Sequence, residues 1–483
     1  MTGDVYSIGG GTFLFELDLA DSLPLASYVE IAPADGSDRY LGQIESATID
    51  ESVGASTGST RTVKGRGTLL SRLGSGDADE LGDDVFAGAT MTQAKPSTVA
   101  AYQDGVNSGH ASLSIGNVQR FSDVPAGLRA DGFGRHTFLC GQSGSGKTYT
   151  LGVILERLLL ETDIRIALLD PNSDFVNMGS IRPQSGAGFS QEEYQAFEAR
   201  YRAVSPGIHV FGGEGSARRL RAKFGRLSFE QQSMVLGLDP IRDPQEFNAF
   251  VRIVRRLDDK DYRLDDILDE IRSSFDEDGR RLGLRIENLG IAQQSIWAGS
   301  NQSVMDGLPD DWRMIVADLG SLDNAEGSIA SAAVLGSFWE RRHARQPLLI
   351  VVDEAHNVCP RTPTDANQAL ATELMIRIAG EGRKFGLYLL LSTQRPAKVH
   401  PNVLSQCDNL LLMKMNSASD ISELSEIFSF VPPSLIELAA GFGLGEGLAA
   451  GKIAPQPVLF RSGRRLTLEG GSDVPSTWAQ QRS

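Results

Sequence analysis

The segment from Gly141 to Thr148 has the residue types and the spacing of a phosphate-binding loop. It reads Gly141-Gln142-Ser143-Gly144-Ser145-Gly146-Lys147-Thr148 and fits the pattern GxxxxGK[ST]. An apolar run, 137–140, precedes it and a helical pattern, 147–161, follows it, which argues against an ordinary glycine-rich turn. We expect backbone N–H groups to surround the β-phosphate, Lys147 to bridge the β- and γ-phosphates, and Thr148 to bind Mg²⁺.

Two adjacent carboxylates follow another apolar run, 348–352. Asp353 is predicted to bind the Mg²⁺ held by Thr148, and Glu354 to act as the general base that polarises the attacking water. An acidic pair at a strand end is also a common helix cap, so the pair alone is unspecific. Together with the phosphate loop it predicts a hydrolase that uses ATP and Mg²⁺. His356 fits a structural role as well as a coupling role.

Three further polar side chains are candidates for the same site. Gln394 follows the apolar run 387–392 and is predicted to contact the γ-phosphate or its attacking water; an ordinary polar strand end is the alternative. Arg383 lies in a glycine-flanked loop, 380–386, and is predicted to reach a neighbouring subunit's nucleotide as an arginine finger. Arg135, directly before the first core strand, is a candidate to lie near phosphate, with a solvated basic residue as the alternative.

Short apolar runs alternate with helical patterns around these residues, which predicts an α/β fold with a parallel sheet. Each run is continuous, as in a strand covered on both faces. The strands are expected at 137–140, 164–170, 314–319, 348–352, 387–392 and 410–415. In a parallel sheet the residues that follow each strand meet at one edge, where the phosphate loop and the carboxylates are needed.

The segments around this core differ in pattern. Residues 1–125 have alternating runs divided by Gly, Ser and Asp clusters, which predicts an all-β barrel or sandwich. Between 187 and 310 we expect a helical insertion without strands, because Ser190 with Glu193 and Ser228 with Gln231 have capping-box spacing. The glycine-rich end is expected to form an extended arm.

Composition narrows the class of protein. The chain has 483 residues, 46 Lys and Arg, 62 Asp and Glu, and a formal charge of −16, so non-specific coating of DNA is excluded. Its three cysteines are too far apart for a zinc site or a disulfide framework, which favours a reducing, cytoplasmic compartment. No apolar stretch approaches the ~20 residues of a membrane span, so we expect no membrane association.

The motifs together resemble the HerA branch of the HerA/FtsK superfamily of hexameric, RecA-like DNA translocases. The resemblance rests on RHTFLCGQSGSGKT, LLDPNSDF with Asp170, LLIVVDEAH, GEGRKFG, LLLSTQRP and GEGLAAG, in that order over residues 135–460. It implies an N-terminal β-barrel (1–125), a RecA-like ATPase core (126–186 and 311–460), a helical bundle (187–310) and a C-terminal arm (461–483) that braces the next subunit. It also implies that arginines like Arg135 and Arg383 complete sites at subunit interfaces.

The leading hypothesis is a homohexameric ATPase that threads double-stranded DNA through a central channel. By the resemblance, it would work with a separate nuclease or NAD-consuming effector, in anti-phage defence or DNA-end processing. Arg361, Lys398 and His400 are candidates for DNA contacts, with solvent-facing loop charges as the alternative. A ring scaffold that gates an effector without translocation is the second hypothesis. A membrane-tethered DNA pump is the third, and the missing membrane span weighs against it.

Overall fold

The computed structural model describes residues 3–54, 58–73, 81, 84–257, 262–274, 276–298, 306 and 308–470. The chain divides into two compact units. The first unit contains residues 1–132, 140–150 and 408–463, and the second contains residues 133–139, 151–407 and 464–483.

A parallel sheet forms the centre of the second unit, which confirms the predicted α/β class. Its strand order is β12 (Ile208–Phe211), β13 (Met314–Asp318), β11 (Arg165–Asp170), β14 (Leu348–Val352), β15 (Leu387–Thr393) and β10 (His136–Cys140). The pairs β12–β13, β13–β11, β11–β14 and β14–β15 are parallel. Every residue of β13 and β14 is buried, which explains why these strands are continuous apolar runs in the sequence.

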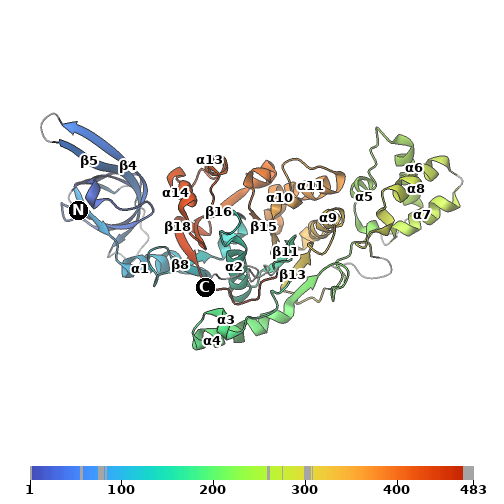
Figure 1. The fold of residues 1–483 in the computed structure, drawn as a ribbon, viewed down its shortest axis with the longest axis horizontal. Helices are drawn as coiled ribbons and strands as arrows, with labels where there is room; N and C mark the ends of the chain where they lie inside the picture. Colours follow the sequence, from blue (N-terminus) through green and yellow to red (C-terminus); the bar gives the residue numbers. More distant parts are fainter. Residues whose placement is uncertain are drawn as a thin grey trace, which may run out of the picture. The chain divides into compact units, whose positions relative to one another are not determined.

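Helices accompany this sheet along the chain (Figure 1). They include α2 (Lys147–Glu161), α9 (Asn324–Glu340), α10 (Ala355–Val358), α11 (Ala366–Glu381) and α12 (Pro401–Leu404). Helices α9 and α11 pack against each other. A short 3₁₀ helix, Gly382–Phe385, joins α11 to β15. No described helix is long and apolar enough to span a bilayer.

The segment between 187 and 310 is mainly helical, but the expectation that it has no strand is wrong. Its described helices follow α3 (Gln184–Ala187) and are α4 (Gln191–Val204), α5 (Phe229–Val235), α6 (Pro244–Leu257), α7 (Leu264–Ser273) and α8 (Glu277–Asn288). The capping boxes predicted at Ser190 and Ser228 are both present. Strand β12 was missed because it has four residues with alternating burial, too short a run to stand out from its helical surroundings.

An antiparallel sheet occupies the N-terminal part of the first unit. Its strand order is β6 (Val85–Ala87), β1 (Gly3–Ile8), β2 (Thr12–Asp18), β5 (Gly58–Leu73), β4 (Arg39–Gly54), β3 (Tyr28–Pro33) and β7 (Ala89–Gln93). Phe13, Val29 and Ile44 are among the residues of its buried core. Helix α1 (Pro96–Val106) interrupts the predicted all-β pattern, and it begins with a proline at its first position, where a missing N–H costs nothing.

The rest of the first unit contains β16 (Cys407–Met413), β17 (Glu446–Gly451), β18 (Ala454–Ser462), β8 (Ser112–Val118) and β9 (Pro125–Arg129), paired antiparallel in this order. Helices α13 (Ala418–Ile427) and α14 (Pro433–Glu437) lie between β16 and β17 in the chain. The glycine-rich segment near residue 445 is therefore the start of a β-hairpin, and the arm begins only after β18.

Candidate functional site

The phosphate loop joins β10 to α2 in a shape that requires glycine. Gly144 has φ 75° and Gly146 has φ 89°, both in the left-handed region. A Cβ on Gly141 would lie 2.7 Å from Ser145 Oγ and 2.8 Å from Met413 Cβ. Helix α2 begins at Lys147, so the N–H groups of its first turn are available to an anion. The strand–loop–helix order predicted from the sequence is present.

Backbone contacts hold the loop in place within the first unit. Gln142 N donates to Lys414 O at 2.9 Å, and Gly445 N donates to Ser145 O at 2.9 Å. The Ser145 hydroxyl is buried and has no hydrogen-bond partner among the residues that the structure describes, and Lys147 is only 4% exposed. An unsatisfied buried hydroxyl beside a glycine-shaped cradle fits a loop built to receive phosphate oxygens.

The acidic pair lies in the second unit, directly after β14. Asp353 is fully buried, and its Oδ1 accepts a hydrogen bond from Ser392 Oγ at 2.6 Å. Asp353 N donates to Leu169 O at 3.1 Å, which ties the pair to the neighbouring strand β11. Because one carboxylate oxygen is fixed by Ser392, the orientation of the Asp353 carboxylate is set before any cation binds. Ser392 had no predicted role.

Glu354, the predicted base, is held by the predicted sensor. Gln394 Nε2 donates to Glu354 Oε1 at 2.8 Å. His356 Nδ1 lies 3.3 Å from Glu354 Oε2 and 2.9 Å from Thr393 Oγ1. Glu354 has φ 42°, a left-handed conformation that is strained for a residue with a side chain and is typical of functional positions. The structure therefore brings Glu354, Gln394 and His356 together from the ends of two adjacent strands.

Asp170 ends β11 beside this group and has its own donors. Its carboxylate accepts hydrogen bonds from Asp174 N at 3.0 Å and Phe175 N at 2.8 Å. Burial raises the pKa of Asp170 to about 7, against the two backbone hydrogen bonds, and the charge of Asp353 adds to the rise. The sequence signal for this arrangement is an aspartate at a strand end followed by the turn-forming residues 171–174.

The two predicted finger arginines lie at the other end of the sheet. Arg383 precedes β15 and Arg135 precedes β10, whereas Glu354 and Gln394 follow their strands. His136, next to Arg135, contacts Ala379 O at 3.0 Å, so both arginines are at the amino-terminal edge. A strand of this length separates its two ends by about 20 Å. The structure does not bring these arginines to the carboxylates of their own chain.

The three residues predicted to contact DNA, Arg361, Lys398 and His400, lie in two loops that are hydrogen-bonded to each other. Arg361 N donates to Lys398 O at 2.7 Å, and His400 N donates to Cys359 O at 2.9 Å. Arg361 and Lys398 are exposed. The loops that follow β14 and β15 thus form a small joined surface on the carboxyl side of the sheet.

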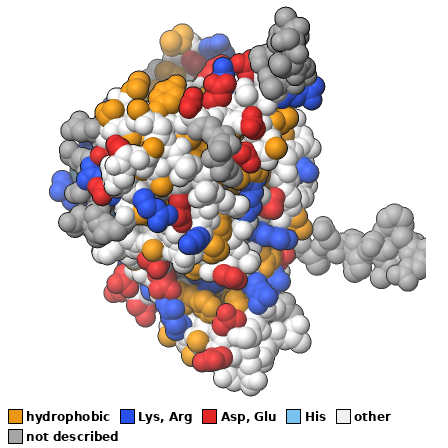
Figure 2. Space-filling model, turned by 90° about the vertical axis from the view of Figure 1, so that its left-hand side faces the viewer, with side chains coloured by type: hydrophobic (Ala, Val, Ile, Leu, Met, Phe, Trp, Pro, Cys, Tyr) orange, Lys and Arg blue, Asp and Glu red, His pale blue; other side chains and the backbone are white. Residues whose placement is uncertain are grey.

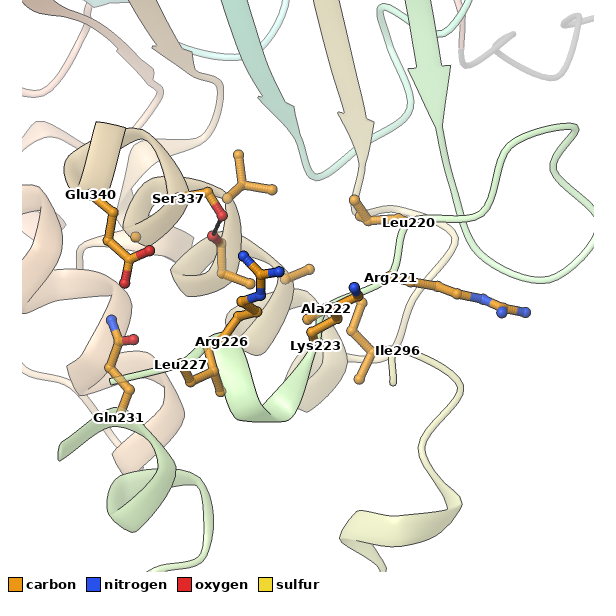
Figure 3. A pocket seen from close by; sticks show the side chains of 14 residues that line it. Leu220, Arg221, Ala222, Lys223, Arg226, Leu227, Gln231, Ile296, Ser337 and Glu340 are labelled. Carbon is orange, nitrogen blue, oxygen red and sulfur yellow. Dashed lines mark hydrogen bonds between the residues drawn. The ribbon is translucent and has the colours of Figure 1, made fainter. Parts of the chain in front are cut away.

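A cavity between the segment before α5 and helix α9 offers no competing ligand site. Figure 3 shows Arg226 and Gln231 on one side and Ser337 and Glu340 of α9 on the other. The cavity measures about 40 Å³, far less than the roughly 300 Å³ at which small-molecule sites begin. Among the described residues no group of three or more His, Cys, Asp or Glu could hold a metal. Mg²⁺, which in proteins is commonly bound through one or two carboxylates plus substrate phosphates, does not need such a group.

Comparison with known proteins finds similarity to HerA helicases. Residues 113–326 match the family described as "Helicase HerA, central domain". The chain is 25% identical over 371 residues to the DNA double-strand break repair helicase HerA of Sulfurisphaera tokodaii, covering 73% of this chain and 69% of that protein. It is 22% identical to HerA of Pyrococcus furiosus, covering 68% and 65% respectively. A shorter match to a probable HerA helicase of Methanocaldococcus jannaschii is 31% identical over 130 residues and covers 27% and 25%.

Solved structures also resemble this chain, over about the same share of its length as the curated relatives. The plasmid coupling protein TrwB in complex with ADP and Mg²⁺ matches with a TM-score of 0.47 and 12% identity, covering 71% of this chain and 89% of that chain. The genome packaging NTPase of Sulfolobus turreted icosahedral virus 2 in complex with ATP-gammaS matches with a TM-score of 0.31 and 12% identity, covering 68% and 97%.

Proposed function

Because the chain is an ATP-hydrolysing enzyme related to the HerA helicases, we propose that it uses ATP to move double-stranded DNA as a homohexameric ring. The observation that carries the proposal is the contact of Gln394 and His356 with Glu354. A carboxylate oriented by an amide at the next strand end is suited to polarise a water in line with a γ-phosphate. A partner effector enzyme, and a role in anti-phage defence or DNA-end processing, are part of the same proposal and are argued below.

In the proposed reaction the residues of this chain divide the work of binding the phosphates, activating the water and holding Mg²⁺. Lys147 and the N–H groups of 141–148 bind and orient the phosphates, and Glu354 accepts the proton of the attacking water. Gln394 holds the Glu354 carboxylate and senses the γ-phosphate. Thr148 and Asp353 would hold Mg²⁺, which supplies positive charge to the phosphate oxygens.

Arg383 and Arg135 are proposed to act in a neighbouring subunit. Their position far from the carboxylates of their own chain supports this, because a finger must then reach another nucleotide. An open hollow of about 350 Å³ on α11, lined by Glu373, Arg377 and Gly380, lies close to Arg383 in the chain and is proposed to receive a neighbour. Head-to-tail contacts of this kind close into rings.

Mixed rings test this sharing. Subunits with Arg383→Ala and subunits with Glu354→Gln are each expected to be inactive alone. Mixing them should restore part of the ATP turnover, because some interfaces regain an intact base and an intact finger. Unrestored turnover in mixtures that form rings by mass measurement would remove Arg383 from the site.

Duplex DNA is the proposed cargo, with Arg361 and Lys398 as phosphate contacts. A few cations per subunit, repeated around a ring, suffice despite the net charge of −16. The test is ATP turnover of the full chain with and without linear duplex DNA. Stimulation is expected. Turnover that duplex DNA leaves unchanged would favour the ring scaffold that gates an effector.

The effector is proposed to be a nuclease or an NAD-consuming enzyme that docks on the N-terminal sheet, in anti-phage defence or DNA-end processing. Figure 2 shows exposed hydrophobic side chains among charged ones on the side of the molecule that faces left in Figure 1. Ile8 and Val85 face each other across β1 and β6 and are 77% and 67% exposed. Exposed apolar pairs of this kind support a protein contact.

The docking test compares the exposed apolar pair Ile8 and Val85 with one exposed apolar control position, Ile241. The product of the neighbouring gene is co-expressed with the full chain and copurification is measured. Ile8→Ser with Val85→Ser is expected to lose the partner, whereas the control Ile241→Ser, at a residue that is 87% exposed in the helical insertion, keeps it. Equal copurification by both variants would move the docking surface elsewhere.

A further inference from the structure

Residues 464–470 form an arm that lies along the segment after β11 of the same chain. Thr467 forms an antiparallel bridge with Ile181, and Leu468 N donates to Ser180 O at 3.0 Å. At the end of the arm, Gly470 N donates to Asp174 O at 2.8 Å. The arm predicted to brace a neighbouring subunit includes residues 471–483, which lie outside the described residues. The described part of the arm contacts the turn that follows Asp170.

A buried ion pair fixes the arm on α2. Glu156 of α2 accepts hydrogen bonds from Leu466 N at 3.0 Å and from Thr467 N and Oγ1 at 2.7 Å each. Arg465 Nε lies 4.0 Å from Glu156 Oε1 and donates to Thr467 Oγ1 at 3.0 Å. Both charged side chains are fully buried. Burying a charged group costs free energy even when the group is paired. A tail that only lay on the surface would not need such a buried ion pair.

Helix α2 has a glycine where the arginine passes. A Cβ on Gly152 would lie 2.5 Å from Arg465 Nε and 2.6 Å from Arg465 Cζ. A glycine inside a helix is less stable than an alanine, so helix α2 loses some stability at this position while leaving room for the Arg465 side chain. The helix that receives Arg465 is the one that begins at Lys147.

The other side of Arg465 contacts the turn that holds Asp170. Its guanidinium lies over the Phe175 ring, 5.4 Å from the ring centre, and its Nη2 is 3.5 Å from Met178 Sδ. Phe175 is one of the two residues whose N–H groups bind the Asp170 carboxylate. In the same turn Ser173 has φ 60° and donates to Asp318 Oδ1 at 2.6 Å. The arm thus supports a strained turn that orients two strand-end carboxylates.

We propose that Arg465 is a positioning residue for ATP hydrolysis, acting through the turn of residues 173–175 to orient Asp170 beside the Asp353 carboxylate. The inference rests on the proposed nucleotide site and adds a part of the chain that no motif covers. Arg465 touches neither the phosphate loop nor the acidic pair among the contacts described above. Its loss should therefore act on the rate of the chemical step and leave nucleotide binding in place.

The test measures kcat, KM and nucleotide affinity of the full chain separately. Arg465→Met keeps an unbranched, flexible side chain but removes the guanidinium, and the Glu156 carboxylate keeps its three donors from the arm. We expect kcat to fall about tenfold or more, since small displacements of reacting groups are expensive, while Kd for a non-hydrolysable ATP analogue changes less than about twofold. Arg465→Lys should restore part of kcat.

Two glycine variants separate positioning from folding. Gly152→Ala pushes on the Arg465 guanidinium and should lower kcat, whereas Gly327→Ala in α9, where a Cβ meets nothing within 4 Å, should not. If Arg465→Met does not fold, Gly470→Ala decides, because its Cβ would overlap the Ser173 carbonyl oxygen at the far end of the arm.

The outcomes distinguish this inference from the proposed function. Wild-type kcat per folded molecule in the arm variants, beside an active wild-type chain, overturns the positioning role alone. The positioning role is also overturned if the activity of the arm variants is lost only in proportion to the fraction of protein that unfolds on heating. A wild-type chain without ATP turnover would overturn the proposed function and the positioning role with it.

Discussion

The phosphate loop and the group around Glu354 are built in different ways. The loop is one run of eight residues whose backbone does the work, and its shape follows from glycines at positive φ. The group around Glu354 gathers side chains from the ends of β11, β14 and β15, which are far apart in the chain. Apart from Lys147 and Thr148, the loop is expected to tolerate changes of side chain but few changes of backbone conformation, whereas the group around Glu354 has the opposite sensitivities.

The largest expected effect is that of Glu354→Gln. The amide keeps the shape of the side chain but cannot accept the proton, so turnover should fall by roughly 100-fold or more. ATP should remain bound, because Lys147 and the loop are intact. Single-turnover hydrolysis and equilibrium binding of ATP measure the two effects. Undiminished turnover would contradict the assignment of the base.

Lys147→Ala should produce the contrasting result in the loop. The γ-phosphate loses its charged partner, so nucleotide affinity and turnover should both decline, the first by about tenfold or more. Titration with a fluorescent ATP analogue measures the affinity. If affinity stays at the wild-type value while turnover is lost, the difference between the loop and the carboxylate group disappears.

Gly146→Ala tests whether the backbone shape of the loop matters by itself. A residue with a Cβ pays about 1–2 kcal/mol in the left-handed region, so the loop should shift and nucleotide affinity should fall by about tenfold. The control is Gly105→Ala in α1, where a Cβ meets nothing within 4 Å. The same titration serves both variants, and equal affinities would mean that the loop adapts without cost.

The sequence predicts the loop better than the carboxylate group for a physical reason. Contiguous motifs such as 141–148 need only local order, and the strand ends at Asp353 and Gln394 follow from apolar runs. The contacts of Ser392 with Asp353 and of His356 with Thr393 depend on which strands are neighbours in the sheet, which the sequence does not state. Strand β12 and the attachment of the arm to α2 likewise depend on tertiary contacts. A run as short as β12 becomes a strand only when a neighbouring strand pairs with it.

Gln394→Ala has a smaller expected effect than loss of the base. Glu354 keeps its contact with His356, so its carboxylate is less well oriented but still present. Turnover should fall by about tenfold, with nucleotide affinity close to wild type. Gln394→Glu is the companion variant, since it places a second negative charge 2.8 Å from the Glu354 oxygen and should be worse than alanine. The opposite ranking of the two variants would mean that Gln394 does not orient Glu354.

The smallest effect is expected from the joined loops after β14 and β15, and it should appear only with DNA present. Arg361→Gln and Lys398→Gln each remove one exposed cation while the backbone bond between these residues stays. If both contact phosphate, each change should lower the slope of log K against log salt by about one, uniformly across DNA sequences. ATP turnover without DNA should not change, because neither side chain contacts Glu354 or Asp353 among the described contacts. Thr364→Ala, an exposed position in the same region, is the matched control and should leave the salt slope unchanged. A slope that is equal in all three variants and the wild type would place the DNA contacts outside these loops.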